Sequence, residues 1–148
     1  MNIPEYITIV ETKRVCKELK ISDWTKLKDP VKVSPKEASI ILKEVNKEKM
    51  EVSLDQFCAG LEVELEHGTR FKDVNVTNNH PILTGKIVLA HMKESLDYYK
   101  YLEVAELEGD LNKAVKNKDL KKITDKYKKL IKAKLILNNA EMSNYSGE

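Results

Sequence analysis

The apolar residues that follow Ser53 recur at the spacing of one face of an α-helix. They lie at positions i, i+3, i+4, i+7 and i+11 of the segment: Leu54, Phe57, Cys58, Leu61 and Leu65. Gln56 lies three residues after Ser53, as in a capping box, and Gly68 is a typical helix-ending residue. An amphipathic helix buries its apolar face against other elements. The pattern therefore predicts a helix from Ser53 to Gly68 within a fold of packed helices.

Other segments carry equally clear helix signals. Ser34, Pro35 and Glu37 form a capping box with proline at the first helical position. Helices are predicted over residues 9–19, 35–47 and 82–94, over a segment that Ser95 caps and Gly109 ends, and from about residue 119. With only five Gly and four Pro in 148 residues, we expect an all-α fold. The predicted fold is a compact bundle of five to six helices with a long basic C-terminal helix. Residues 1–137 would form a single domain, and residues 138–148 a frayed polar tail.

Composition excludes several classes of protein. Charged residues make up 34% and apolar residues 41% of the chain, so it resembles neither a disordered nor a membrane protein. The net charge of +2 does not by itself indicate nucleic-acid binding. The N-terminus lacks the pattern of a signal peptide, and Cys16 and Cys58 show no CxxC spacing. We expect a cytoplasmic protein with no membrane partner.

Two Glu/His pairs are the strongest candidates for a functional site. Glu64 and His67 are three residues apart, as are His91 and Glu94, so each pair shares one helix face. If the two helices converge, one outcome is a polar network within the core. Another is an Fe, Mn or Zn site that an oxidoreductase could use, since carboxylate-bridged bundles use Glu-x-x-His pairs with further Glu. A third is acid/base catalysis without a metal. Supporting polar residues are Glu62, Tyr98 and Tyr99.

The C-terminal helix carries apolar residues at alternating spacings of three and four. They form a heptad-like seam: Leu120, Ile123, Tyr127, Leu130 and Leu137. Lysines dominate residues 113–134, without arginine. One interpretation is a solvated lysine face. A second is docking of the seam to a protein partner or to a second copy of the chain, and a third is charge-driven attraction to nucleic acid.

Three motifs in the same order resemble a known family. "DQFCAGLEVELEHG", "NVTNNHPILTGKIVLAHMKE" and "LDYYKYL" resemble small bacterial and phage domains of unknown function with the pattern GL-VELEHG, NVTNDDP, TGKIALAHL and PDYY. The family-like core covers about residues 54–106, with a weaker piece at 17–24. The resemblance implies an all-helical fold and supplies no reaction. Asn79 and His80 replace its acidic pair, and Leu96 replaces its proline. If that pair binds a cation in the family, this chain has lost the ligands.

No phosphate-binding loop, nucleophile elbow or Ser/His/Asp arrangement occurs in the sequence. This points away from an enzyme. The expected function is therefore a non-enzymatic structural or partner-binding module, with phage origin and virion association suggested by the resemblance alone. The alternatives are a divalent-metal protein that uses the Glu/His cluster and a nucleic-acid binder that uses the C-terminal helix.

Overall fold

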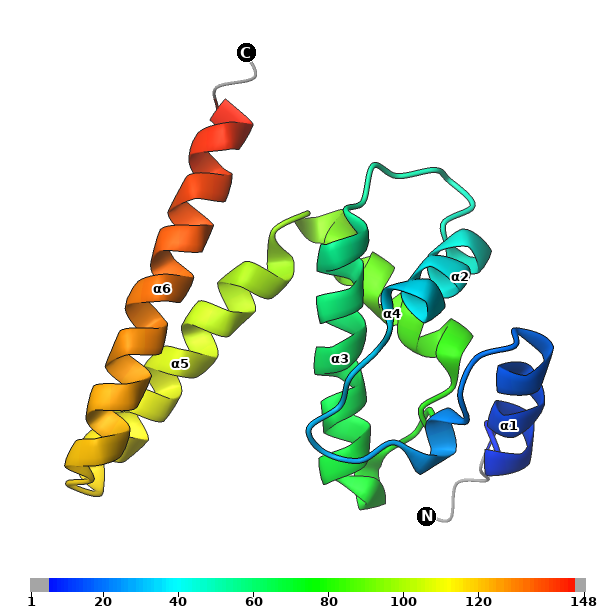
Figure 1. Cartoon of the computed structure of the whole chain (residues 1–148), viewed down its shortest axis with the longest axis horizontal. Coiled ribbons are helices and arrows are strands. Elements are labelled where there is room, and N and C mark those ends of the chain that lie inside the picture. The colour runs from blue at the N-terminus through cyan, green and yellow to red at the C-terminus, as the bar shows by residue number, and fades with distance from the viewer. Residues whose placement is uncertain (1–5, 146–148) are drawn as a thin grey trace. The chain divides into compact units, whose positions relative to one another are not determined.

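The computed structural model describes residues 6–145, and this part of the chain contains helices and no strand (Figure 1). The elements are α1 (Ile9–Glu18), η1 (Trp24–Lys26), α2 (Pro35–Val45), α3 (Leu54–Arg70), η2 (Lys72–Val74), α4 (Pro81–Glu94), α5 (Tyr98–Lys116) and α6 (Leu120–Tyr145). The predicted all-α fold with a long C-terminal helix is confirmed. None of the helices between residues 6 and 145 combines the length and apolar character needed to cross a lipid bilayer.

Contacts between residues divide the chain into two compact units. The first extends to Leu96 and contains the elements from α1 to α4, and the second begins at Asp97 and contains α5 and α6. The predicted single domain of residues 1–137 stays a prediction, because two compact units can belong to one domain or to two.

Three predicted helix starts are found in the structure. The Thr8 hydroxyl accepts a hydrogen bond from the Glu11 amide at 3.1 Å, and Pro81 opens α4. Ser34 and Glu37 form both halves of a capping box. The box predicted at Ser53 is wrong, because that side chain makes no capping hydrogen bond to α3. Most helix caps in which the two partners are three residues apart were therefore predicted correctly from the sequence.

The predicted helix ends at glycines are wrong. Gly68 lies inside α3 and Gly109 inside α5, and neither has the positive φ that favours glycine at a helix end. A glycine within a helix costs about 1 kcal/mol relative to alanine, which packing of the surrounding helix can exceed. The residue at the N-cap position of α5 is Asp97, two residues after the predicted Ser95. Ser95 follows the last residue of α4.

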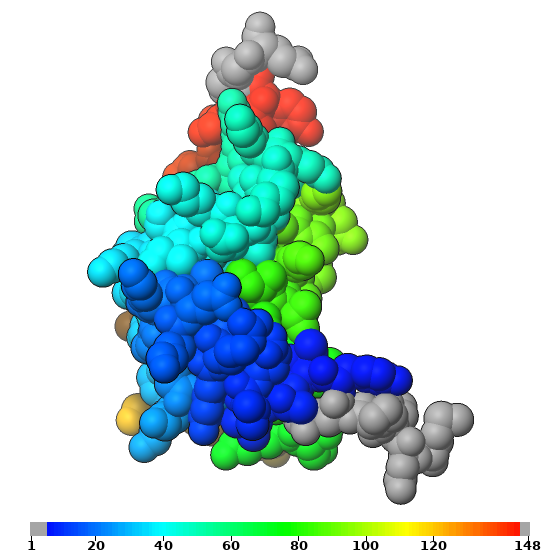
Figure 2. All heavy atoms as spheres, turned by 90° about the vertical axis from the view of Figure 1, so that its right-hand side faces the viewer, coloured from blue at the N-terminus to red at the C-terminus, as the bar shows by residue number. Residues whose placement is uncertain are grey.

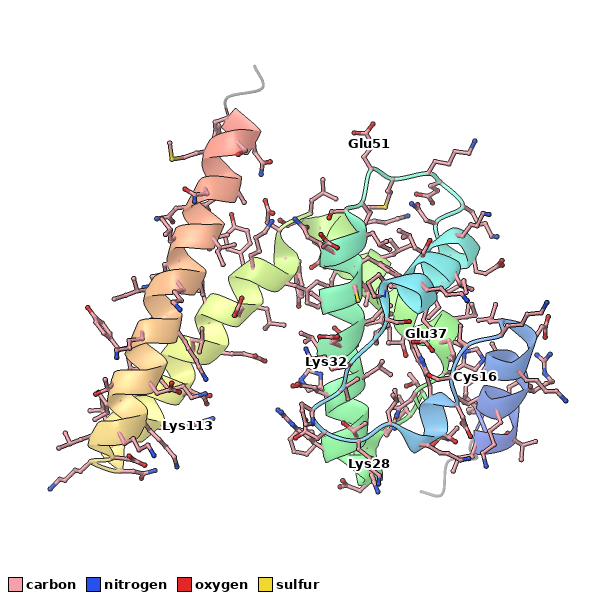
Figure 3. The ribbon with its side chains drawn as sticks, in the orientation of Figure 1. Cys16, Lys28, Lys32, Glu37, Glu51 and Lys113 are labelled. Atoms are coloured by element: carbon pink, nitrogen blue, oxygen red, sulfur yellow. The ribbon has the colours of Figure 1, made fainter. Side chains whose placement is uncertain are left out.

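Helices α2, α3 and α4 pack against one another to form the centre of the first unit. Its core contains fully buried side chains from η1 and from all three helices: Trp24, Ile41, Phe57, Leu61 and Val88. Segments that contain α1 and α2 cover one face of this unit (Figure 2). Cys16 points from α1 into the interior and is 2% exposed (Figure 3).

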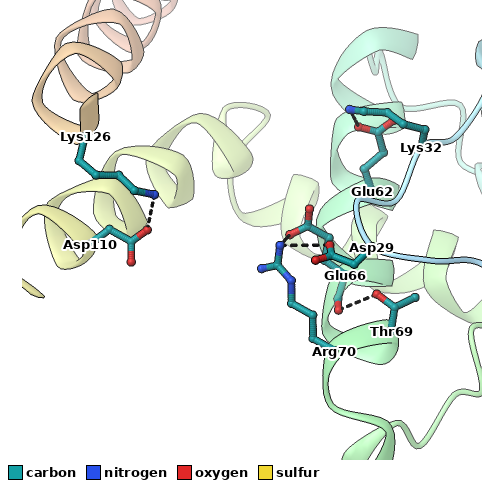
Figure 4. A network of polar contacts seen from close by, with 8 residues as sticks. All are labelled: Asp29, Lys32, Glu62, Glu66, Thr69, Arg70, Asp110 and Lys126. Carbon is teal, nitrogen blue, oxygen red and sulfur yellow. Dashed lines mark hydrogen bonds and ion pairs between the residues drawn. The ribbon is translucent and has the colours of Figure 1, made fainter. Parts of the chain in front are cut away.

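Helices α5 and α6 lie side by side as an antiparallel hairpin (Figure 1). Leu107, Leu130 and Ala133 form its buried apolar cluster. Four polar links extend from one end to the other: Asn144 Nδ2 to Asp97 Oδ2 at 2.9 Å, Tyr101 hydroxyl to Glu141 Oε1 at 2.7 Å, Lys134 Nζ to Glu108 Oε1 at 2.6 Å, and Lys126 Nζ to Asp110 Oδ2 at 2.6 Å. The last is visible in Figure 4.

These links explain why α6 is longer than predicted. Its sequence becomes polar after residue 137, yet the helix continues to Tyr145. Glu141 and Asn144 hold this end against the start of α5. Residues 146–148 of the predicted tail lie outside the described residues.

Candidate functional site

The structure brings together one Glu and one His of the predicted cluster. Glu64 on α3 and His91 on α4 approach to 3.6 Å between Oε1 and Nε2. Their side chains are 15% and 31% exposed, respectively. At this distance they form an ion pair when the imidazole is protonated. The pair joins the two central helices of the first unit at the edge of its core.

The other two predicted ligands are not part of a metal cluster. His67 and Glu94 are both exposed. Between residues 6 and 145, no three His, Cys, Asp or Glu side chains gather in a group that could hold a metal ion. Most metal sites in proteins need three or more protein ligands. The Fe, Mn or Zn site therefore stays a prediction, and the described geometry supplies two neighbouring side chains for it.

Glu62 has a partner on a different part of the first unit. Its carboxylate accepts a hydrogen bond from the Val33 amide at 3.0 Å and from Lys32 Nζ at 2.8 Å (Figure 4). The Cys58 thiol, one turn earlier on α3, donates to the Val33 carbonyl at 3.2 Å. Residues two apart on a helix do not share a face, so Glu62 points away from Glu64. It anchors the extended segment before α2 to α3.

Tyr98 and Tyr99 open α5 in the second unit. Their rings form an edge-to-face pair with centroids 5.2 Å apart, and Tyr99 is 9% exposed. The Tyr99 side chain is therefore buried and in contact with the Tyr98 ring. Whether either hydroxyl donates to the Glu/His cluster stays a prediction.

The loop before α4 contains an asparagine clasp, formed by Asn75, Asn78 and Asn79. Asn75 Nδ2 donates to the Gly68 carbonyl at 3.0 Å and to Asn79 Oδ1 at 2.9 Å. Asn79 Nδ2 donates to the Trp24 carbonyl at 3.4 Å, and Asn78 Nδ2 donates to the Ile7 carbonyl at 2.6 Å. The clasp thus ties the end of α3 to η1 and to the segment before α1.

Two of these asparagines have a left-handed backbone. The φ angles are 47° at Asn78 and 58° at Asn79. Asparagine adopts this conformation more readily than other residues with a side chain, because its short amide forms local hydrogen bonds. The same motif therefore supplies both the unusual turn and the amide groups that bind neighbouring carbonyls. From the sequence, Asn79 is predicted only as one residue of the replaced acidic pair, and the clasp itself is not predicted.

The clasp also explains the glycine in the "LEHG" motif. A Cβ atom at Gly68 would lie 2.2 Å from Asn79 Oδ1 and 2.8 Å from Asn75 Nδ2. Both distances are shorter than van der Waals contact allows. Glycine is therefore needed inside α3 so that the clasp can approach the helix backbone.

His80 caps the N-terminus of α4. Its Nδ1 accepts a hydrogen bond from the Leu83 amide at 3.4 Å, and its carbonyl accepts one from the Thr84 hydroxyl at 3.0 Å. Burial lowers the pKa of His80 below its ordinary value of 6.5, although the nearby Glu11 carboxylate acts in the opposite direction. The neutral imidazole is the form that can accept at Nδ1.

This cap offers a reason for one of the departures that the resemblance implies. The resemblance implies an acidic residue where His80 stands. Aspartate is among the preferred N-caps, since its carboxylate accepts from the first helical amides. A structural cap is therefore a sufficient reason for a carboxylate at this position. The sequence did indicate that position 80 is an N-cap, because proline is common at the first helical position and Pro81 follows directly.

A small cleft of about 160 Å³ lies beside the Glu64–His91 pair. Its lining includes the Glu64 and His67 side chains together with Phe71, Val76, Thr84 and Ile87. Its volume is smaller than the 300–1,000 Å³ usual for small-molecule sites, so it accommodates only a few non-hydrogen atoms.

The two cysteines, Cys16 and Cys58, are poor candidates for a nucleophile. Burial raises the pKa of both thiols, so each is a poor nucleophile at neutral pH.

The residues of the predicted C-terminal seam do not share one surface. Leu130 and Leu137 are buried in the hairpin at 7% and 8% exposed, and Ile123 is half-buried. Leu120 and Tyr127 are 78% and 55% exposed. The reason is that α5 covers one side of α6, along Leu130, Ala133 and Leu137. The predicted seam therefore combined residues from the covered side of α6 with residues from its open side.

A second apolar row lies on the open side of α6. We call it the outer stripe, with the following exposed fractions: Leu120 78%, Tyr127 55%, Ile131 51%, Leu135 60%, Met142 66% and Tyr145 82%. At 100° per residue these positions fall within a sector about 80° wide. Its centre is about 120° around the helix from the buried row. Helix α6 is thus apolar on two faces, and only one of them is used within the hairpin.

Comparison with known proteins identifies a family for most of the chain. Residues 12–108 match the family described as Protein of unknown function (DUF5661). The match includes most of α1, all of α2, α3 and α4, and the first half of α5, whereas α6 lies outside it. Comparisons with curated proteins and with solved structures find no match. Since the matched segment covers more than half of the 148 residues, the chain belongs to the DUF5661 family, whose function is unknown.

Proposed function

We propose that this protein is a non-enzymatic helical module that binds another protein through the outer stripe of α6. The observation that carries the proposal is the exposure of six large apolar side chains along one face of a single helix. Soluble proteins seldom expose contiguous apolar surface of this kind unless it is an interaction site. A straight apolar row on a helix suits packing against a second helix.

The hairpin holds the outer stripe ready for binding. Polar links at Asp97, Tyr101, Glu108 and Asp110 fasten α6 to α5 along most of its length. An isolated helix would lose conformational entropy on binding, whereas a helix held in place has already lost most of it. The fold therefore favours α6 as a docking helix.

Photo-crosslinking tests this proposal directly. The photoreactive residue p-benzoylphenylalanine would replace Ile131 or Leu135 in the outer stripe, and Lys122 or Lys129 on the opposite side of α6 as matched controls. The full-length chain would be produced in the cells from which the gene comes. We expect a discrete crosslinked protein from the two stripe positions and none from the controls. Equal labelling at all four positions, or none at any, would contradict the proposal.

Metal binding remains the second candidate, because Glu64 and His91 lie 3.6 Å apart beside a cleft. Elemental analysis of protein purified without a histidine tag tests it. Stoichiometric Fe, Mn or Zn that is lost in the His91→Ala variant would establish a metal protein. Protein that is metal-free after growth with all three metals would exclude it.

Nucleic-acid binding has less support from the described side chains. Lys126, Lys129 and Lys134 form ion pairs with Asp110, Asp125 and Glu108, respectively, so part of the lysine charge of α6 is neutralised. Binding that weakens steeply with salt would support it. Phage origin and association with virions stay predictions from the resemblance, and mass spectrometry of purified particles is the test.

A further inference from the structure

We infer that the outer stripe binds an amphipathic helix that carries a row of acidic residues along one flank. This inference rests on the proposed function and names the chemistry of the partner. It follows from the distribution of charge on the two sides of the stripe.

One side of the outer stripe carries a row of lysines without internal partners. Lys121, Lys128 and Lys132 are seven and four residues apart, so they align along α6 next to the stripe. All three are exposed. Between residues 6 and 145, no ion pair involves them. We call them the lysine row.

The other side of the stripe faces α5 and carries carboxylates. Lys134 is neutralised by Glu108 at 2.6 Å, and Glu141 accepts a hydrogen bond from the Tyr101 hydroxyl at 2.7 Å. That hydrogen bond, from a phenol to a carboxylate, raises the pKa of Tyr101. The stripe therefore has one basic flank and one flank that is neutral to acidic.

This asymmetry favours a helix over a membrane. Helices that lie on anionic membranes carry basic residues around their polar face. Here an anionic surface would meet the carboxylates of Glu108 and Glu141 on one flank. A partner helix can place its own acidic residues against the lysine row alone, so the charges match on one flank only.

An antiparallel second copy of α6 is a poorer match. A two-fold antiparallel arrangement of two outer stripes places both lysine rows on the same side of the interface. That arrangement concentrates positive charge, whereas an acidic row removes it. The stripe from Tyr127 to Tyr145 is about 27 Å long at 1.5 Å per residue. The expected partner is therefore a helix of about 18 residues with apolar residues at i, i+3, i+4 and i+7 and Glu or Asp on one flank.

Designed peptides provide the probe. Three 21-residue amphipathic helices would share one apolar face and differ only on one flank, which carries Glu, Gln or Lys. Binding to the full-length protein is measured by fluorescence anisotropy up to 1 mM protein at low and at high salt. We expect the Glu peptide to bind about tenfold more tightly than the Gln peptide, from three exposed ion pairs. This difference shrinks at high salt.

Charge reversal identifies the surface. In the Lys128→Glu/Lys132→Glu variant the order should invert, so that the Lys peptide binds best. The matched control Lys122→Glu/Lys129→Glu makes the same charge change on the opposite side of α6 and should leave the order unchanged. Ile131→Asp should abolish binding of all three peptides. Circular dichroism of each variant checks that the helix content is retained.

The outcomes separate the inference from the proposed function. Equal binding of the Glu and Gln peptides, lost in Ile131→Asp, would overturn the acidic partner and keep the docking stripe. If no peptide binds and the crosslinks at residue 131 are also absent, both fail. Binding to phosphatidylglycerol vesicles that Lys128→Glu/Lys132→Glu removes, without peptide binding, would assign the stripe to a membrane. A dimer in sedimentation that Ile131→Asp dissociates would assign it to a second copy.

Discussion

Replacing Gly68 by alanine should destabilise the first unit, although alanine normally strengthens a helix. An ordinary Gly→Ala change inside a helix gains about 1 kcal/mol. At Gly68 the new Cβ would lie 2.2 Å from Asn79 Oδ1. The Asn79 side chain is buried and is held by Asn75 and the Trp24 carbonyl, so it cannot move without losing these bonds.

The expected magnitude follows from the bonds that must break. Loss of the Asn75–Asn79 and Asn79–Trp24 hydrogen bonds, which leaves buried polar groups without partners, costs about 2–4 kcal/mol. Subtracting the helix gain of about 1 kcal/mol leaves a net loss of about 1–3 kcal/mol. Gly109→Ala is the matched control, because a Cβ there meets no atom within 4 Å. That variant should gain about 0.5–1 kcal/mol.

Urea unfolding with two optical probes provides the assay. Trp24 is the only tryptophan, is fully buried and belongs to the first unit, so its fluorescence reports on that unit. Far-ultraviolet circular dichroism reports on all helices and records the gain from Gly109→Ala. In the double variant Gly68→Ala/Asn79→Ala the closer of the two clashes is absent and only the 2.8 Å approach to Asn75 Nδ2 is left, so the combined loss should be smaller than the sum of the two single losses. A Gly68→Ala protein as stable as the parent, or strictly additive losses, would refute the clasp as the reason for the glycine.

Three further predictions concern the first unit. Thr12→Val should raise the free energy of unfolding by about 1 kcal/mol, because the buried Thr12 hydroxyl has no hydrogen-bond partner. Thr84→Val should lower the free energy of unfolding by about 1 kcal/mol in the same melts, because it removes the hydrogen bond to the His80 carbonyl. The pKa of His80 is below 6.5 when folded, so the folded state binds fewer protons and stability should fall as pH drops from 6.5 through the lowered pKa. A pH series of urea melts should show this slope, and His80→Asn should flatten it; parallel curves would contradict the assignment. Gly85→Ala should cost about 1–3 kcal/mol by overpacking, since its Cβ would lie 2.6 Å from Ile41 Cγ2, and an unchanged thermal midpoint would refute this.

Local signals in the sequence predicted much of the fold. The helix starts at Thr8, Ser34 and Pro81 depend on contacts within three residues, which a sequence displays directly. The helix ends predicted at Gly68 and Gly109 were wrong, because the sequence alone does not distinguish a glycine inside a helix from a glycine that follows a helix. Only the distant Asn79 side chain shows why Gly68 belongs inside α3.

The candidate site was predicted in part for the same reason. The i, i+3 spacing placed Glu64 on the correct face of α3, and the structure pairs it with His91. Glu62 instead accepts a hydrogen bond from the Val33 amide. The two residues are 29 positions apart, and helical periodicity does not predict such distant contacts. The burial of Leu130 likewise depends on where α5 lies. Helical periodicity identifies an apolar face but does not say which neighbour covers it.

The boundary of the family match falls inside α5, so the residues of one apolar cluster lie on both sides of it. Leu107 belongs to the matched segment, whereas Leu130 and Ala133, which cover it here, do not. A chain cut back to the matched segment would therefore expose this leucine to water unless another protein surface covered it.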